Sequence, residues 1–588
     1  MNQEQVSTSH LGYLCAGRKV AVVRDVTSDT FEVQHMGILS QGPLAGRSAF
    51  QPMHEGPIVR EESSMGTFGL CDFSALTQPG IYRVVLRESG VCSFQFAIAD
   101  GAYHQLPRLF LDFMHEWRAG HFASDLHRPG HLDDGVRSDD GAPWDAVGGW
   151  YDAGDLRKWM GHSTLPALAL LEIDEQLGLP RQHFHEADAL PSDWLTEAAW
   201  GLRFIFKMQD PQTGMIYEDV GGGSTARWRE GMSWWYENHA GCYADNADNR
   251  FTDNLPGTGD ERRVRIQYNP IAQYTNLTIL ARAARAYAPH HAELAAQSYA
   301  AMLALWRFCE TRLEDEEHTW TSVRAWRLIA LLELFQMGYC GVEAVDAALA
   351  ALLQNWDEAL GFWQRSASEA EPYRGILHSA QPLIALAKTL ELLPDQPQAA
   401  RIVAVMQRCK VAYIDPMTQT NPYRFMPFGL YSQPMTEGDT YRPFAAGRLV
   451  RFCMPVHHPQ QINHGLSGHW MSWAHALAYG GQVLGDASWT ALAWAQIEWL
   501  LGNNPYDVSF VSGVGYNNPM PHSRYLGTVI GGFMNGFRGT PKDWPYVDLA
   551  REAEWNSTEY WNVPLSNSLM ALARLLPRRI ADVRKLGA

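Results

Sequence analysis

The first hundred residues contain short runs in which apolar and polar positions alternate. The runs at 19–23, 30–34, 81–86 and 92–98 are rich in β-branched and aromatic residues, and the turn Thr77-Gln78-Pro79-Gly80 precedes the third of them. Short strands separated by Pro/Gly turns are typical of a β-sandwich. We therefore predict a β-sandwich over residues 1–98, followed by a hinge at Ala99-Asp100-Gly101.

From about residue 104, apolar residues recur every three or four positions, as in a helix. Within 192–206, one face collects Trp194, Leu195, Ala198, Leu202, Ile205 and Phe206, and Ser192 is placed to cap the helix. Similar patterns occur near 104–117, 162–177, 270–288, 293–311, 321–338, 343–356, 377–393, 396–412, 466–485, 487–501 and 563–577. The pattern predicts about twelve helices within a second, all-α domain over residues 104–588.

Long loops interrupt the helical pattern. They cover residues 118–161, 209–268, 413–465 and 503–560, and no fixed-period repeat is present. A solenoid is therefore disfavoured. Since long loops on a rigid scaffold usually carry function, we expect the chemistry to lie in these segments.

Composition narrows the class of protein. A chain of 588 residues exceeds what one ordinary core fills, so two domains are expected. No apolar run approaches the roughly 20 residues that span a bilayer, which argues against a membrane partner. The formal net charge of −17 argues against nucleic acid and favours a neutral substrate.

The cysteine pattern and the N-terminal sequence indicate in which cellular compartment the protein is expected. The 8 cysteines show no C-x-x-C spacing, so neither a zinc knuckle nor a disulfide framework is predicted. Residues 1–5 lack the basic and apolar regions of a signal peptide. The protein is expected to be cytoplasmic, or to begin after a secretion signal that has been removed.

The most informative stretch is 148–155, Gly-Gly-Trp-Tyr-Asp-Ala-Gly-Asp. It places Asp152 and Asp155 three residues apart in a glycine-rich turn, next to Trp150 and Tyr151. Two like charges held close do not ionise independently, and raising the proton affinity of an aspartate is one way to make a general base. The aromatic pair could form a platform for a sugar ring. The alternative is a surface turn with solvated acids.

Several motifs, taken together and in order, resemble glycoside hydrolase family 9, the inverting β-glycanases that include many cellulases. They are the segments at 149–155, 501–505, 509–513 and 521–524, and an opening at 10–14 followed by 19–23. The resemblance covers nearly the whole chain. It implies an N-terminal immunoglobulin-like β-sandwich followed by an (α/α)6 barrel, which agrees with the independent helix count.

The resemblance also implies catalytic roles. Asp155 would be the general base that activates water, and Asp152 would bind the same water. Ungapped alignment on Ala571-Leu572-Ala573 places the general acid on Glu559, with Glu552 and Glu554 as rivals. The aromatic neighbours of Glu559 favour it, since an apolar wall raises a carboxyl pKa. The alternative for Glu559 is a capping acid of the helix that follows.

Substrate contacts are implied by the same resemblance. His522 and Arg524 would bind sugar hydroxyls, and Trp235 and Trp561 join Trp150 and Tyr151 as candidate sugar-contacting aromatics. Two departures from the family pattern stand out. Met232 occupies a position where a sugar-binding histidine is common, and the doubled histidine before the late arginine is reduced to His522-Ser523. Hydroxyl recognition should therefore differ from that of a plain cellulase.

No cofactor is expected, although a structural calcium ion is one possibility. Asp245, Asp248 and Asp253 offer the oxygen donors that calcium prefers, but without EF-hand spacing, and a solvated acidic loop is the alternative. His457-His458 and the pair His464 and His469 lack any known metal-ligand spacing. We interpret these histidines as lining a polar cleft.

The leading hypothesis is an inverting glycoside hydrolase that cleaves β-1,4-linked glucan or its oligosaccharides. One alternative is an exo-acting β-glycosidase on amino-sugar oligomers such as a β-glucosaminide, whose positive charge an acidic cleft would favour. Another is a non-catalytic carbohydrate-binding relative. For an inverting enzyme, the acid and base carboxyls should stand roughly 6.5–9.5 Å apart.

Overall fold

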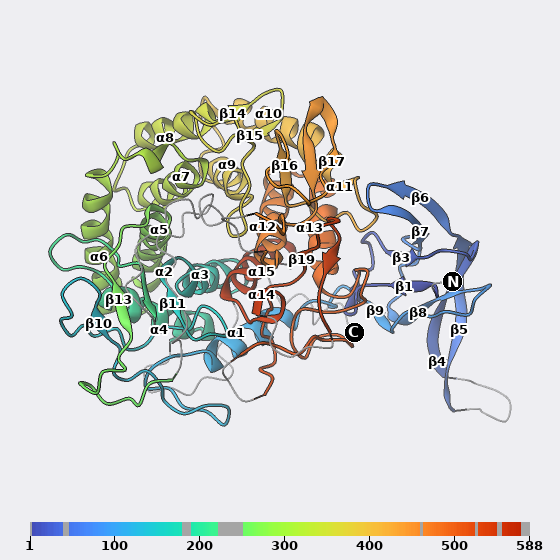
Figure 1. The fold of residues 1–588 in the computed structure, drawn as a ribbon, viewed down its shortest axis with the longest axis horizontal. Coiled ribbons are helices and arrows are strands. Elements are labelled where there is room, and N and C mark those ends of the chain that lie inside the picture. Colours follow the sequence, from blue (N-terminus) through green and yellow to red (C-terminus); the bar gives the residue numbers. More distant parts are fainter. Residues whose placement is uncertain are drawn as a thin grey trace.

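The computed structural model describes residues 3–38, 46–178, 190–221, 251–458, 463–523, 527–549 and 555–577. The chain first forms a β-rich part and then a larger helical part, which lie side by side in Figure 1. Within the described ranges, no helix has the length and apolar character needed to cross a membrane.

The β-rich part consists of two sheets. Its strands are β1 (Gln5–Ser7), β2 (Gly12–Tyr13), β3 (Val20–Arg24), β4 (Thr30–Ile38), β5 (Ser48–Pro57), β6 (Val59–Ser63), β7 (Gly66–Asp72), β8 (Gly80–Leu86) and β9 (Phe96–Ile98). The strand orders are β1-β3-β7-β6 and β2-β9-β8-β4-β5, and the pairing of β2 with β9 is parallel. Buried residues such as Val23, Phe31, Val84 and Phe96 belong to one hydrophobic cluster. Alternate positions of the strands therefore face a common core.

The predicted strand at 92–98 is shorter in the structure. Only Phe96–Ile98 form β9, whereas Cys92 makes a single isolated bridge with Val85. The Ser93 hydroxyl accepts a hydrogen bond from the backbone NH of Val84 at 3.0 Å and donates to the carbonyl of Phe94 at 2.7 Å. The Ser93 side chain thus forms backbone hydrogen bonds that would otherwise be made between the backbones of two paired strands.

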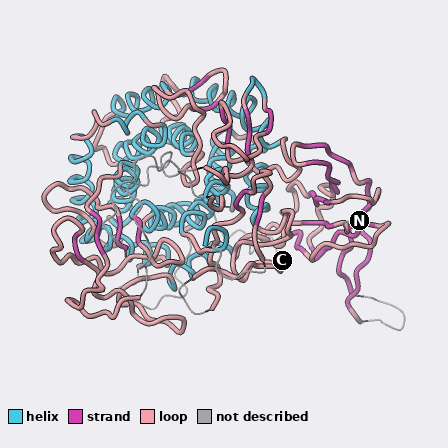
Figure 2. The backbone as a smooth tube through the Cα atoms, viewed as in Figure 1, coloured by secondary structure: helices cyan, strands magenta, loops and turns pink. Residues whose placement is uncertain are grey.

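The helical part is built around a closed ring of helices. The inner helices are α3 (Leu165–Leu177), α5 (Pro270–Tyr287), α7 (Thr321–Gln336), α9 (Gln381–Leu392), α12 (Ser467–Leu484) and α15 (Asn562–Leu575). Each contacts the next in this order, and α15 contacts α3, which closes the ring. A second layer is formed by α1 (Leu106–Glu116), α4 (Asp193–Lys207), α6 (Ala292–Glu310), α8 (Val342–Gln354), α10 (Ala399–Cys409) and α13 (Ala487–Leu500). Figure 2 shows the two layers as concentric circles of helices.

The outer helix α6 and the inner helix α12 differ in how much of their surface is buried. On the outer helix α6, the buried residues are Leu294, Ser298, Ala301, Met302, Leu305 and Cys309, which lie along one stripe. The inner helix α12 is buried on every side over Ser467–Gly481. Each of the twelve helices predicted from hydrophobic periodicity lies in one of these layers, and Ser192 caps α4 by accepting from the NH groups of Trp194 and Leu195.

Short elements fill the connections. They are α2 (Met160–Ser163), α11 (Asp415–Thr418), α14 (Trp555–Thr558), β10 (Val136–Arg137), β11 (Lys158–Trp159), β12 (Asp219–Gly221), β13 (Arg263–Arg265), β14 (Trp356–Asp357), β15 (Phe362–Trp363), β16 (Gly429–Tyr431), β17 (Arg442–Pro443), β18 (Leu449–Arg451), β19 (Arg538–Gly539) and β20 (Pro545–Tyr546), with 3-10 turns at Glu316–Thr319 and Ala445–Gly447 and a π turn at Lys410–Ile414. The sheet β10-β13-β12-β11 adjoins the 148–155 segment.

The two parts pack directly against each other. His10 Nε2 lies 3.0 Å from Asp507 Oδ1, and the NH of Ser64 donates to the carbonyl of Thr420 at 3.0 Å. Gly502 has a φ of +115° and lies so close to His10 that a Cβ would meet its ring at 2.2 Å. A larger residue at 502 would therefore separate the two parts.

Candidate active site

The segment that carries Asp152 and Asp155 forms a tight turn ahead of α3. Gly148 and Gly149 enter it with φ angles of 109° and 72°, and a Cβ on Gly149 would meet the Phe204 ring at 2.5 Å. The turn is closed by a hydrogen bond of 2.8 Å from the NH of Asp152 to the carbonyl of Arg157. Glycine is needed at 149 because both its backbone angle and its surroundings exclude a side chain.

This turn lies against the segment that precedes α15. The NH of Gly154 donates to the carbonyl of Tyr560 at 3.0 Å, and the NH of Asn562 donates to the carbonyl of Asp152 at 2.9 Å. A Cβ on Gly154 would lie 2.2 Å from the carbonyl oxygen of His522 and 3.2 Å from Cγ of Glu559. The missing side chain at 154 therefore lets Glu559 approach the aspartate pair.

The ring of helices explains why residues far apart in sequence meet here. The turn precedes α3, the Glu559 segment precedes α15, and α3 and α15 are neighbours in the inner ring. Because an outer helix returns the chain between successive inner helices, the segments that lead into inner helices gather at one end of the ring. The structure thus brings Asp152, Asp155 and Glu559 together.

Burial dominates the electrostatics of Glu559. The residue is 7% exposed, and this burial, reinforced by the charges of Asp155 and Asp152, holds the pKa of Glu559 well above its usual range. Hydrogen bonds from the backbone of Asp155 and the side chain of Asn535 oppose the shift. Glu559 is therefore suited to carry a proton at neutral pH, as a general acid must.

Within the aspartate pair, burial raises the pKa of Asp152 well above its usual range, and the neighbouring charge of Asp155 adds to the effect. Arg157 and the backbone NH of Trp159, which donates to Asp152 Oδ1 at 3.3 Å, act in the opposite direction. Asp155 is only partly buried, and its Oδ1 accepts from the NH of Arg157 at 3.2 Å. Burial therefore favours the protonated form of Asp152.

Buried ion pairs stabilise the turn that carries Asp152 and Asp155. The buried guanidinium of Arg157 pairs with Asp219, which also accepts from Arg265 Nε at 2.6 Å. Arg262 Nη2 lies 2.6 Å from Asp134 Oδ2, and Arg262 Nη1 donates to the carbonyl of Leu156. None of these residues was predicted from the sequence, although the Arg157-Lys158 pair, two residues after Asp155, is a visible signal.

Histidines and one tryptophan form the neighbouring wall. His162 Nδ1 lies 3.8 Å from Asp152 Oδ2, and the Trp561 ring meets His162 and His464 edge to face at 6.0 Å and 5.0 Å between ring centres. Burial lowers the pKa of His162 to about 3 and that of His464 to about 4, so both rings are neutral at neutral pH. His464 had been expected in a polar cleft, whereas His162 had not been singled out.

Trp150 and Tyr151 do not form the exposed sugar platform that was expected. Both are 0% exposed. The Trp150 indole NH donates to Glu197 Oε1 at 2.7 Å, and its ring fills the space left by Gly201, where a Cβ would meet it at 2.1 Å. The Tyr151 hydroxyl lies 2.8 Å from His131 Nδ1. Since neither ring presents a face to solvent, both act as supports of the turn.

The other predicted residues divide into three groups. His522 lies beside Glu559, because its NH donates to the carbonyl of Thr558 at 2.9 Å and its backbone bridges to Glu559. Two histidines lie apart from the candidate site: His457 pairs with Asp439 at 3.3 Å, and His469 is buried against Ser379 at 2.7 Å. Arg524, Trp235, Met232, Glu552, Glu554, Asp245 and Asp248 are outside the described residues.

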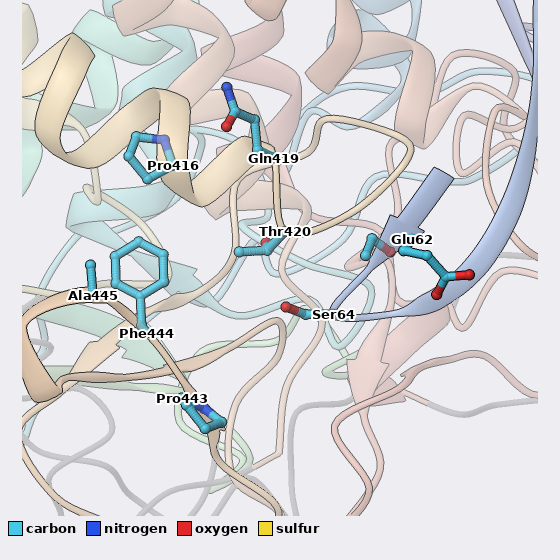
Figure 3. Close-up of a pocket in the computed structure, with 9 residues that line it drawn as sticks. Glu62, Ser64, Pro416, Gln419, Thr420, Pro443, Phe444 and Ala445 are labelled. Carbon is cyan, nitrogen blue, oxygen red and sulfur yellow. The ribbon is translucent and has the colours of Figure 1, made fainter. Parts of the chain in front are cut away.

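A separate groove of about 600 Å³ lies where the two parts of the molecule meet (Figure 3). Its lining comes from Glu62, Ser63 and Ser64 on one side and from Pro416, Gln419, Thr420, Pro443, Phe444 and Ala445 on the other. None of the candidate catalytic residues lines it. The groove is therefore distinct from the candidate site.

Part of the helical region is similar to known sequences. The family model described as glycosyl hydrolase family 9 matches residues 103–369. The chain is 30% identical over 235 residues to a cellodextrinase of Butyrivibrio fibrisolvens, a match that covers 37% of this chain and 40% of the relative. It is 28% identical over 237 residues to a xyloglucan-specific endo-β-1,4-glucanase of Bacteroides ovatus, covering 37% of this chain and 38% of that protein. The matched stretch thus spans less than half the length of either relative.

Solved structures share the fold over nearly the full length. A metagenome-derived family 9 endoglucanase superposes with a TM-score of 0.67 at 20% identity, covering 97% of this chain and 99% of that one. A family 9 protein of Bacteroides ovatus gives a TM-score of 0.65 at 19% identity, with the same coverage of both chains. Residues 103–369 thus match glycosyl hydrolase family 9, and nearly the whole chain shares the fold of solved family 9 structures.

Proposed function

We propose that the protein is an inverting glycoside hydrolase that cleaves β-1,4-linked glucan or its oligosaccharides. The observation that carries the proposal is the meeting of Glu559 with the Asp152–Asp155 turn across the glycine at 154. It joins a buried carboxyl with a raised pKa to a second carboxyl, Asp155, that is partly open to solvent. These are the two roles that inverting hydrolysis requires.

In the proposed step, Glu559 donates its proton to the glycosidic oxygen as the bond from that oxygen to the anomeric carbon breaks. Asp155 accepts a proton from water, whose oxygen bonds to the anomeric carbon from the opposite face. Asp152 and the neutral His162 hold that water or a neighbouring sugar hydroxyl. Carboxyl groups transfer both protons, so the step needs no cofactor.

For substrate contacts we propose His522, beside the acid, and Trp561, beside Asp152 and the histidines. The similarity to a cellodextrinase and to a xyloglucan-specific endo-β-1,4-glucanase supports a β-1,4-glucan as substrate. We also propose that the architecture is an immunoglobulin-like β-sandwich followed by an (α/α)6 barrel. The two sheets over residues 5–98 and the closed ring of inner helices support this assignment.

The proposal is tested with the purified protein, defined cello- and xyloglucan-oligosaccharides, and proton NMR of the first-formed products. The expected result is release of the α-anomer from a β-linked substrate, because water attacks opposite the leaving group. Asp155→Asn and Glu559→Gln should each reduce turnover by about 100-fold or more. Asp395 is an exposed acid remote from the candidate site, so Asp395→Asn is the matched control and should keep the turnover rate of the unaltered protein.

Three outcomes would contradict the proposal. Initial release of the β-anomer would mean a covalent intermediate and would remove the role given to Asp155. If only glucosaminide oligomers were hydrolysed, the substrate would be an amino-sugar oligomer and not a β-1,4-glucan. Sugar binding without turnover of any β-linked oligosaccharide would identify a binding protein.

A further inference from the structure

Three aspartates converge beside the loop at 251–260. Asp133, Asp253 and Asp260 each offer a carboxylate oxygen, and these three oxygens all lie within 4.8 Å of one another. Asp133 belongs to the segment before β10, whereas the other two bracket a loop more than a hundred residues later. Of the aspartates considered as calcium ligands from the sequence, Asp253 is the one within the described residues, and its partners differ from those expected.

Asp133 is the buried member of this cluster. It is 5% exposed, and one of its oxygens, Oδ1, accepts a hydrogen bond from the Thr252 hydroxyl. The other, Oδ2, is buried and has no hydrogen-bond partner in the described part of the chain. A buried carboxylate oxygen without a partner is strongly unfavourable unless a ligand satisfies it.

Within the described ranges, no basic side chain pairs with the three acids. Among the described residues, no ion pair joins Asp133, Asp253 or Asp260 to a lysine, arginine or histidine. The nearby guanidiniums are engaged elsewhere, since Arg262 pairs with Asp134 at 2.6 Å and Arg137 pairs with Asp139 at 2.7 Å. Among the residues that the structure describes, no ion pair therefore offsets the mutual repulsion of the three carboxylates.

The loop itself holds the carboxylates in place. Asp260 Oδ2 accepts from the NH of Asp253 at 2.9 Å, and Asp253 Oδ1 accepts from the NH of Leu255 at 2.8 Å. Asn254 Oδ1 accepts from the NH of Leu132 at 3.0 Å, which ties the loop to the residue next to Asp133. The arrangement is thus fixed before any ligand arrives, which limits the ordering entropy that binding must overcome.

We propose that Asp133, Asp253 and Asp260 bind one calcium ion. All three donors are oxygens, which suits a hard cation, and two of them lie on an exposed loop that leaves room for water ligands. The absence of histidine and cysteine from this donor set disfavours zinc. The proposal goes beyond the proposed hydrolysis and does not depend on it.

The ion would stabilise the surroundings of the catalytic turn. It would join the segment at 131–134 to the loop at 251–260. The neighbouring Asp134 is paired with Arg262, whose guanidinium donates to the carbonyl of Leu156 in the turn that carries Asp152 and Asp155. Calcium is therefore expected to raise thermal stability, because it binds the folded state alone.

The test is calorimetric titration of CaCl2 into EDTA-treated, dialysed full-length protein, with melting temperatures measured in parallel. Asp253→Asn and Asp260→Asn should each weaken calcium binding by about tenfold or more and reduce the calcium-induced rise in melting temperature. Asp395→Asn changes the net charge equally at a remote exposed position and should behave as the unaltered protein. These exposed substitutions avoid the folding defect that Asp133→Asn could introduce.

Two results would overturn the assignment. One is the absence of calcium binding to the unaltered protein, or binding that survives both loop substitutions undiminished. The other is equal or tighter binding of MgCl2 at the same stoichiometry, which would show that the site does not select the larger cation.

Discussion

His162 Nδ1 lies 3.8 Å from Asp152 Oδ2, and the side chains of both residues are 6% exposed. The separation is longer than a direct hydrogen bond and short enough for one small polar group to contact both. Burial lowers the pKa of His162 to about 3, so its ring is neutral at neutral pH, and burial raises the pKa of Asp152 well above its usual range. Both shifts disfavour charge beside the partly open Asp155.

The first prediction concerns this pair. His162→Phe should lower kcat by about tenfold or more, since it removes a polar contact from the general acid–base machinery. His162→Asn keeps a polar group and should recover part of the loss. The measurement is kcat and KM between pH 5 and 9, with His457→Asn, whose side chain is 50% exposed, as the control. Wild-type kcat in His162→Phe would assign this residue to packing alone.

The second prediction concerns Gly154. A Cβ here would lie 2.2 Å from the His522 carbonyl oxygen and 3.2 Å from Glu559 Cγ, so Gly154→Ala must push Glu559 away from the aspartates. We expect activity to fall by about 100-fold or more, with a loss of about 1–3 kcal/mol in stability. Gly161→Ala, whose Cβ meets nothing within 4 Å, is the control for both assays. Full activity in Gly154→Ala would contradict the role given to this close approach.

The third prediction concerns stability against pH. Glu498 is buried where α13 meets the β-rich part, and burial raises its pKa from 4.5 to about 8, against the opposing charges of Arg18 and Lys19. The folded state therefore holds the proton more tightly than the unfolded state. The stabilisation is fully present below pH 4.5 and declines as the pH rises towards 8, by up to about 1.4 kcal/mol per pH unit.

Glu498→Gln should remove this dependence of stability on pH. Compared with the unaltered protein, the variant should therefore be less destabilised at pH 8 than at pH 5.5. Thermal or urea unfolding at both pH values measures the difference. Glu437→Gln, at an exposed position, should leave the slope unchanged. If the two variants respond alike, the titration belongs to another group.

The fourth prediction separates support from substrate contact at Trp150. Trp150→Phe keeps an aromatic ring but loses the hydrogen bond to buried Glu197, and it should lower the free energy of unfolding by about 1–2 kcal/mol. KM should not change, because the ring is 0% exposed. Urea unfolding measures the free energy of unfolding, and steady-state kinetics measure KM. A raised KM with unaltered stability would restore Trp150 to the substrate-binding surface.

Local pattern was enough to predict much of the fold. Hydrophobic periodicity located all twelve helices of the two layers, because each helix must bury a stripe or its whole surface whatever its neighbours are. Ser192 was identified as a cap for an equally local reason, since its hydroxyl oxygen bonds the NH groups two and three residues later. The strand at 92–98 was overestimated because a serine side chain there competes with the backbone.

At the candidate site, sequence pattern alone was enough to propose Asp152, Asp155 and Glu559, because their flanking residues resemble a family pattern along the chain. The inward orientation of Trp150 and Tyr151, and the approach of His162 to Asp152, depend on the packing of distant segments. The same holds for Asp133, whose carboxylate lies beside those of Asp253 and Asp260, more than a hundred residues later. Periodicity and motifs report on neighbours in sequence, whereas burial, pKa and metal ligation depend on which distant segments the closed ring of helices brings together.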